Sequence, residues 1–230
     1  MKDIQKLAKE WGFSFSNIDL LKQALVHRSY LNENPDFEIG HNERLEFLGD
    51  AVLEIIVTEY LYFKFPKTSE GSLTNWRASL VNSKILHKVA EELLIDDYLY
   101  LSKGEAKDKN KKSRQYILAN AVEAIIGAIY LDQGIKQTKK FVKKYILSKL
   151  QDILDNKLYH DPKSKFQEKA QEIKGTTPHY EILEEKGPDH DKIFKVGLYL
   201  KDELITTGKG SSKQEAQVNA AEIALKKLNW

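Results

Sequence analysis

The chain has 230 residues, of which 41% are hydrophobic and 30% charged, a composition typical of a soluble globular protein with one large or two small domains. It contains no cysteine, which excludes disulfide bridges and thiolate metal sites and fits a reducing compartment. The formal net charge of +2 is too small to indicate a nucleic-acid partner by itself, so any such surface must come from local clusters of charge.

The sequence also bears on targeting and membranes. The N-terminal stretch MKDIQKLAKEWGF is amphipathic and mixed in charge, without the basic-then-apolar order of a signal peptide. The most apolar run, Tyr116 to Leu131, is short for a membrane span and contains Glu123. We therefore expect a cytoplasmic protein that does not associate with membranes.

Residues 1 to about 155 are predicted to form one helix after another, because apolar side chains recur there every three or four residues. The lysine-rich stretch 102–114 interrupts this pattern and is predicted to be a mobile surface loop. The predicted helices cover residues 7–11, 18–30, 43–65, 75–94, 116–131 and 136–154.

The pattern changes after the stretch LYHDPKSK, which ends at residue 165. A short helix over 166–173 is followed by three runs of alternating apolar residues, 179–187, 192–200 and 203–210, with turn residues between them. A final helix is predicted over 212–228. The predicted fold class is therefore an all-α domain, residues 1–155, followed by a small α+β domain of order α-β-β-β-α, residues 156–230.

The predicted helix over 43–65 carries three acids, Glu43, Glu46 and Asp50, on one face. Asn42 is a good N-cap residue, and acids in the first turn interact well with the helix dipole, so Glu43 and Glu46 need no functional explanation. Asp50 lies too far along the helix for that effect. It also follows Gly49, and both are poor helix formers.

A second helix, predicted over 116–131, is apolar nearly all round and should be buried. Asn120, Glu123 and Gly127 form a narrow polar stripe along it. A buried carboxylate costs several kcal/mol unless a partner compensates it. Glu123 is therefore predicted either to pair with a distant arginine or to share a cation with the acids of the other helix.

The shared cation explains both helices at once. If the two polar stripes face each other, four oxygen-bearing side chains converge, and a divalent cation relieves the repulsion between the carboxylates. Oxygen ligands suit Mg²⁺ or Mn²⁺. The absence of cysteine and of any HExxH spacing among the six histidines argues against zinc, and there is no P-loop motif.

Several stretches resemble the ribonuclease III family. HNERLEFLGDAVL, starting at His41, is similar to its signature, and ILANAVEAIIGAIYLD, starting at Ile117, to its second acidic helix. LKQALVHRSY and EGSLTNWRASLVNSKIL are similar to two further blocks of the nuclease domain. GPDHDKIFKV and GKGSSKQEAQVNAA resemble stretches of the double-stranded-RNA-binding domain that follows it in bacterial members.

The resemblance implies a Mg²⁺-dependent endoribonuclease, with Mn²⁺ as a substitute, that hydrolyses double-stranded RNA and leaves 5′-phosphates. It also implies a homodimer formed through the nuclease domain and a role in processing ribosomal and other structured RNA. By this resemblance the catalytic and metal-binding positions are Glu46, Asp50, Asn120 and Glu123, and the accessory acids are Glu43 and Glu70.

Asn120 departs from the family, which usually has Asp at this position. An amide oxygen can still bind a metal or orient a water, but it brings no charge, so we expect weaker Mg²⁺ binding. The alternative functions are a non-catalytic RNA-binding protein, which Asn120 favours, and an unrelated hydrolase with paired carboxylates, such as a glycosidase.

The resemblance also places an RNA-binding surface on the second domain. Such domains read the shape of A-form RNA through its minor groove. Lys209 and Lys213 flank the start of the last helix, where a helix N-terminus favours phosphate; the alternative is that they are solvated surface charge. The residues implied are Gln167, Glu168, Pro188, His190, Lys209, Ser212 and Lys213.

Overall fold

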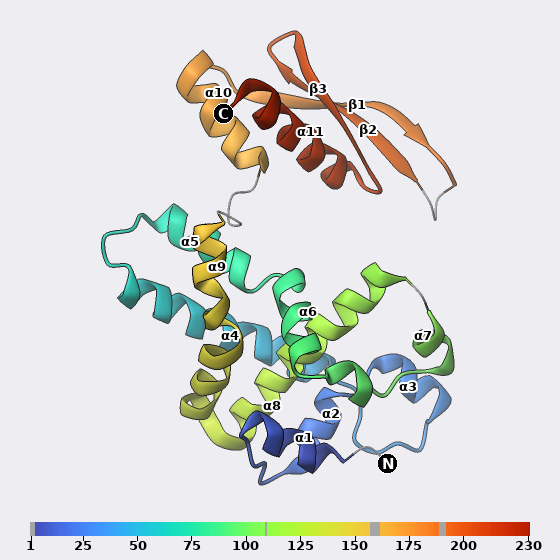
Figure 1. The fold of residues 1–230 in the computed structure, drawn as a ribbon. Coiled ribbons are helices and arrows are strands. Elements are labelled where there is room, and N and C mark those ends of the chain that lie inside the picture. Colours follow the sequence, from blue (N-terminus) through green and yellow to red (C-terminus); the bar gives the residue numbers. More distant parts are fainter. Residues whose placement is uncertain (1–2, 109, 157–161, 189–191) are drawn as a thin grey trace. The chain divides into compact units, whose positions relative to one another are not determined.

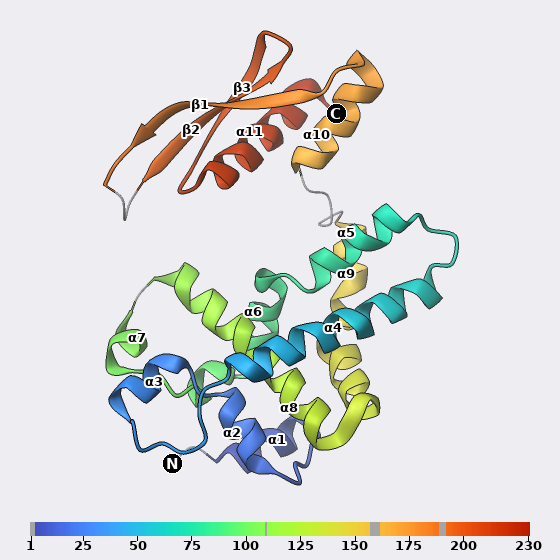
Figure 2. The same ribbon diagram turned by 180° about the vertical axis from the view of Figure 1, so that it is seen from behind.

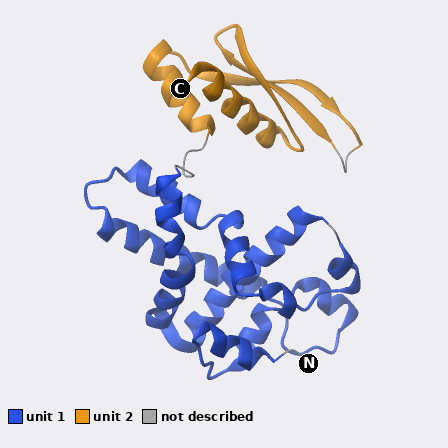
Figure 3. Ribbon diagram, in the orientation of Figure 1, with its two compact units in different colours: residues 1–159 blue, residues 160–230 orange. Residues whose placement is uncertain are grey.

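The computed structural model describes residues 3–108, 110–156, 162–188 and 192–230. Contacts between residues divide the chain into two compact units, Met1–Tyr159 and His160–Trp230 (Figure 3). Each unit has a hydrophobic core of its own.

The first unit is helical in all its regular elements within the described ranges (Figure 1). Its α-helices are α1 (Ile4–Trp11), α2 (Ile18–Ala24), α3 (Arg28–Glu33), α4 (Glu43–Lys64), α5 (Glu70–Leu80), α6 (Ser83–Glu92), α7 (Lys103–Lys107), α8 (Lys111–Tyr145) and α9 (Leu150–Asp155). Two 3₁₀ turns, η1 (Ile95–Tyr98) and η2 (Leu147–Lys149), connect them.

Helix α8 runs through the centre of this unit, and α2, α4 and α6 pack around it (Figures 1 and 2). Between Ile117 and Ile129 its apolar residues on all sides are buried, among them Ile125 and Ile126, which have no exposed surface. The predicted burial is confirmed for this stretch, whereas Tyr116 and Leu131, at the ends of the predicted helix, are about half exposed. At Gly134 the backbone leaves helical geometry, with φ 71°, and the helix continues in a new direction.

The predicted helix 18–30 is wrong, because the chain breaks into α2 and α3. The backbone between them forms a short parallel bridge with Tyr100: His27 N–H donates to the Tyr100 carbonyl at 3.0 Å, and Tyr100 N–H donates to that of Leu25 at 2.9 Å. The predicted helix 75–94 is likewise two helices, α5 and α6. Asn82 caps the second by accepting from the Ile85 amide at 3.0 Å.

The prediction of a mobile loop over 102–114 is also wrong. Helix α7 lies within this stretch, and α8 already begins at Lys111. Two backbone amides fasten α7 to α3: that of Ser102 donates to the Ser29 hydroxyl at 3.1 Å, and that of Lys103 to both carboxylate oxygens of Glu33 at 3.1 Å. These tertiary contacts have no local sequence signal.

The second unit contains α10 (Pro162–Lys174), β1 (Pro178–Lys186), β2 (Ile193–Leu200), β3 (Glu203–Gly210) and α11 (Lys213–Leu228). The strands form an antiparallel sheet of order β1-β2-β3, and α11 packs on one of its faces (Figure 1). Alternate residues Leu198 and Leu200 point to the core with Phe166 and the alanines of α11. The predicted fold class, all-α followed by α-β-β-β-α, is confirmed.

No helix in the described part of the chain combines the length and apolar character needed to cross a membrane.

Candidate active site

Two glycines let α4 and α8 cross at backbone contact. A Cβ built on Gly49 would overlap the carbonyl group of Glu123, 2.6 Å from its carbon, and lie 2.9 Å from the Gly127 nitrogen. A Cβ on Gly127 would lie 3.1 Å from the carbonyl carbon of Leu45. Real Cβ atoms do not approach this closely, so any larger residue would separate the helices. Gly49, a weak helix former, is therefore required by the packing.

The crossing brings the predicted site residues together. Glu46 and Asp50 extend from α4 on either side of Gly49, while Asn120 and Glu123 extend from α8. Burial raises the pKa of Glu46, as do the charges of Glu43 and Asp50, whereas a hydrogen bond with the Asn120 side chain lowers it. Asp50 is the exposed member of the group.

Glu123 is the most perturbed carboxylate of the group. Burial, followed by the charges of Asp50 and Glu46, raises its pKa from an ordinary 4.5 to about 8. No ion pair joins Glu123 to a basic residue in the described ranges, and no positive charge opposes the rise in its pKa. For these residues, the alternative of a salt bridge to a distant arginine is wrong.

Among the described residues, the carboxyl groups therefore form a cluster that no basic group compensates, with oxygen donors alone, which is the donor set that Mg²⁺ and Mn²⁺ prefer. As they stand, no three His, Asp or Glu side chains in the described residues are arranged closely enough to hold a metal ion. Mg²⁺ keeps several of its waters when bound to proteins, so a loose set of carboxylates is compatible with it. The residues fit such a cation in chemistry.

A cavity of about 290 Å³ opens beside Glu46 and Asn120. Glu43 lines it and pairs with Arg28 at 3.4 Å and His41 at 3.8 Å, and it is about half exposed. The cavity is lined by His27, Asn42, Glu43, Glu46, Glu105, Ser113, Tyr116, Ile117 and Asn120.

Asn42 has a different role from the predicted one. Its side chain makes no capping hydrogen bond at the start of α4 and is buried instead. It donates to the carbonyl of Ala24 at 3.3 Å, and its backbone amide donates to that of Val26 at 2.9 Å. Asn42 thus ties the start of α4, and the acids that follow, to the end of α2.

Glu105 and His27 are among the polar residues of this cavity that the sequence did not predict. Glu105 lies on α7, in the stretch predicted to be a mobile loop, and accepts a hydrogen bond from Ser113 at 3.5 Å. His27 caps α3, and burial lowers its pKa although Glu105 and Glu43 act in the opposite direction. The signature that starts at His41 contains neither residue, although His27 lies within LKQALVHRSY, and only the fastening of α7 to α3 brings Glu105 here.

The structure does not bring Glu70 to this cluster within one chain. Glu70 begins α5 and accepts a hydrogen bond from Thr74 at 3.1 Å. It lines a separate cavity of about 450 Å³ between α4 and α5, together with Arg77 and Thr58. Glu43, by contrast, lies beside Glu46 as predicted.

The second unit holds the predicted RNA-binding residues. Gln167 and Glu168 lie on α10 and line an open depression of about 720 Å³ with Gln171 and Thr177. Pro188 is exposed just after β1. His190 lies outside the described residues.

The other three lie where β3 ends and α11 begins. Ser212 is the N-cap and accepts from the Glu215 amide at 3.2 Å, so its hydroxyl also organises the helix. Lys213 lies with its ammonium 5.9 Å from the centre of the Phe194 ring, and Lys209 is exposed at the end of β3. Both lysines are thus at the helix start, as predicted.

A helical domain with carboxylates gathered at a helix crossing, followed by an α-β-β-β-α domain, is the architecture of a nuclease joined to an RNA-binding module. Residues 17–150 match the family model described as ribonuclease-III-like, and residues 162–228 match the double-stranded RNA binding motif. The chain belongs to the ribonuclease III family and is an endoribonuclease of that type.

Relatives match over nearly the whole chain. The chain is 44% identical to Ribonuclease 3 of Carboxydothermus hydrogenoformans over 227 residues, which cover 99% of this chain and 96% of the relative. It is 43% identical to Ribonuclease 3 of Nitratiruptor over 228 residues, covering 99% and 98%. The crystallised nuclease domain of ribonuclease III from Campylobacter jejuni is 40% identical, with a TM-score of 0.54, over 64% of this chain and 95% of that domain.

These findings answer the two alternative functions left open by the sequence. The relatives that match over nearly the full length are ribonucleases, so the chain is an enzyme rather than a non-catalytic RNA-binding protein. The same matches exclude a glycosidase.

Proposed function

We propose that this enzyme hydrolyses phosphodiester bonds of double-stranded RNA in a Mg²⁺-dependent reaction that leaves 5′-phosphate ends. The observation that carries the proposal is the crossing of α4 and α8, which gathers Glu46, Asp50 and Glu123 without a balancing basic group among the residues that the structure describes. The processing of ribosomal and other structured RNA in the cytoplasm is the physiological role that we infer from family membership.

The residues have distinct tasks in this proposal. Glu46, Asp50 and Glu123 would hold Mg²⁺, and Asn120 would add its amide oxygen. Bound there, the cation would stabilise charge on the phosphate oxygens and lower the pKa of an attacking water. The Asn120 side chain lies close enough to Glu46 to lower the pKa of that carboxyl.

The second unit holds the duplex. Its exposed lysines at the start of α11, Lys209 and Lys213, would contact phosphates, and α10 would present Gln167 and Glu168 to a minor groove. The double-stranded RNA binding motif over 162–228 supports this assignment.

Cleavage of a long RNA duplex across a Mg²⁺ titration tests the proposal. Because Asn120 brings no charge, we predict that Asn120→Asp reaches half its maximal rate at a lower Mg²⁺ concentration, by about three- to tenfold. Direct titration of Mg²⁺ into the RNA-free proteins should likewise show that Asn120→Asp binds the cation more tightly than the wild type does. A wild-type enzyme that cleaves equally well in EDTA would refute the proposal.

We further propose that the enzyme is a homodimer formed through the nuclease unit. Helix α4 leaves three large apolar side chains exposed on the side away from α8: Phe47 at 82%, Ile55 at 60% and Tyr62 at 66%. Such a stripe is costly in water and typical of an interface. A related structure, the C. jejuni nuclease domain, is described as having a flexible region involved in dimer formation.

Sedimentation tests the dimer. Phe47→Asp places a charge within this apolar stripe and should convert the protein to a monomer without changing its helix content. Leu94→Asp is the matched control, because Leu94 is 59% exposed but lies outside α4. If both variants sediment as wild type does, α4 is not the interface.

A further inference from the structure

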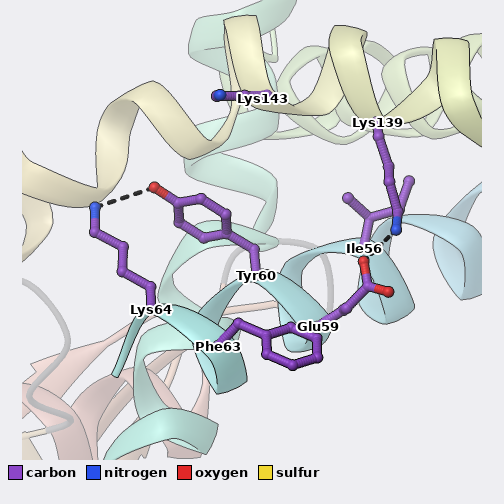
Figure 4. Close-up of a pocket in the computed structure, with 7 residues that line it drawn as sticks. All are labelled: Ile56, Glu59, Tyr60, Phe63, Lys64, Lys139 and Lys143. Carbon is purple, nitrogen blue, oxygen red and sulfur yellow. Dashed lines mark hydrogen bonds and ion pairs between the residues drawn. The ribbon is translucent and has the colours of Figure 1, made fainter. Parts of the chain in front are cut away.

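A second cavity, of about 430 Å³, lies in the nuclease unit between the C-terminal half of α4 and the part of α8 that follows Gly134 (Figure 4). It does not include any of the acids assigned above. Its lining residues are Ile56, Glu59, Tyr60, Phe63, Lys64, Lys139 and Lys143.

The break in α8 builds this cavity. The chain turns at Gly134, and the Thr138 hydroxyl donates to the Gly134 carbonyl at 3.0 Å just beyond the turn. Phe141 is fully buried and anchors the continuing helix in the core. Lys139 and Lys143, four residues apart, then lie on one face of the helix, and Lys139 reaches Glu59 of α4 (Figure 4).

The cavity carries excess positive charge, because three lysines and one glutamate line it. Lys139 pairs with Glu59. Lys64 donates to the Tyr60 hydroxyl at 3.0 Å, which holds its ammonium group without neutralising it. Lys143 forms no ion pair within the described part of the chain, and no dashed line joins it to another lining residue in Figure 4.

The other half of the lining is apolar and aromatic. Ile56 closes the floor and is only 3% exposed, whereas the Phe63 ring is 73% exposed at the mouth. The Phe63 ring contacts the neighbouring Tyr62 ring edge to face, with centroids 5.3 Å apart, and most of its surface stays exposed. An exposed aromatic ring together with unneutralised ammonium groups suits a ligand with a flat π-system and an anionic group. Bases stack on exposed aromatic side chains, and lysines bind phosphate.

We propose that this cavity binds a nucleotide, with the base against Phe63 and the phosphate at Lys143 and Lys64. The volume fits one nucleotide rather than a peptide helix, which needs an extended groove. The proposal goes beyond the cleavage of duplex RNA and does not depend on it. The nucleotide would come either from the free pool or from an unpaired end of an RNA substrate.

Binding of AMP to the full-length protein in EDTA tests the proposal without cleavage or metal. Titration followed by NMR should show saturable shifts at residues around the cavity. Phe63→Ala removes the stacking surface and Lys143→Glu reverses the free charge, so each should weaken AMP binding about tenfold or more. Lys140→Glu is the matched control, since Lys140 is exposed on the same helix but does not line the cavity.

Comparing the binding of a blunt RNA duplex with that of a duplex carrying a single-stranded extension identifies the source of the nucleotide. If an unpaired end is the ligand, a duplex with a single-stranded extension binds more tightly than its blunt form, and Lys143→Glu removes the difference. If the blunt and extended duplexes bind alike while AMP still binds, the ligand is a free nucleotide.

Three outcomes would overturn the proposal: no saturable AMP binding by the wild-type protein, equal weakening by Lys140→Glu and Lys143→Glu, or binding of an acidic peptide in place of AMP. A change of oligomeric state in Phe63→Ala without AMP binding would instead assign the cavity to a second copy of the chain. Loss of Mg²⁺-dependent cleavage bears only on the proposed function.

Discussion

At the scale of single residues, Glu123 is the carboxyl group of the site whose ionisation the fold disfavours most. Its carboxylate is partly buried between Asp50 and Glu46, without a basic partner in the described residues. Its pKa is about 8 in the folded chain and about 4.5 in the unfolded chain. The folded state therefore keeps a proton that the unfolded state releases at lower pH.

This difference predicts a pH-dependent stability for the metal-free protein. The folded state binds more protons between about pH 4.5 and pH 8, so the free energy of unfolding should fall as the pH rises through this window and level off above it. The loss should be about 2–4 kcal/mol, since partial exposure weakens the full effect. Denaturant unfolding in EDTA at several pH values measures it.

Glu123→Gln is the matching variant. It should remove most of this pH dependence and abolish cleavage, while duplex binding stays nearly unchanged. It should also abolish the rise in Tm that we expect Mg²⁺ to give the wild type. A variant that cleaves at the wild-type rate would show that Glu123 is not part of the site.

At the scale of elements, the approach of α4 to α8 decides whether the site exists. Gly49 and Gly127 are the contact points, and the side chains that flank them form the cluster. Asn42 holds the start of α4 against α2, and α7 is fastened to α3, so both the acids and the neighbouring cavity depend on contacts between elements.

Gly49→Ala should therefore destabilise the protein by about 2–4 kcal/mol, because the new methyl group overlaps the backbone of α8. Thermal or denaturant unfolding measures the change, and Mg²⁺ affinity should fall with it. Gly71→Ala is the control: it lies in α5 with nothing within 4 Å of the added Cβ, so better helix propensity should leave stability equal or up to about 1 kcal/mol higher. Equal effects at both positions would contradict the close crossing.

At the scale of the whole molecule, catalysis and RNA binding belong to two units with separate cores. The acids lie in the first unit and the lysines of the α11 start lie in the second. A change in one unit should therefore alter one property and spare the other.

Lys213→Ala tests this separation. It should weaken duplex binding and lower the slope of log K against log salt by about 1, because one phosphate contact is lost. Mg²⁺ binding and the Tm of the first unit should not change. Lys226→Ala, at the opposite end of α11, is the control and should bind as wild type does. A salt slope unchanged in Lys213→Ala would identify Lys213 as solvated surface charge.

The sequence by itself determined much of this protein, because its signals are local. Apolar periodicity predicted the helical domain and the alternating strands, and the acids of two helices predicted an oxygen-rich site. The family resemblance, which rests on long stretches of sequence, predicted the class of enzyme.

The tertiary structure decided what local patterns do not encode. The break between α2 and α3 depends on hydrogen bonds to Tyr100, and the ordering of α7 depends on Ser29 and Glu33. From the sequence alone, Gly49 is only a weak helix former. A glycine is needed there because the backbone of Glu123, 74 positions further along the chain, contacts Gly49 in the fold. Contacts between distant segments are set by packing, and packing is a property of the assembled core.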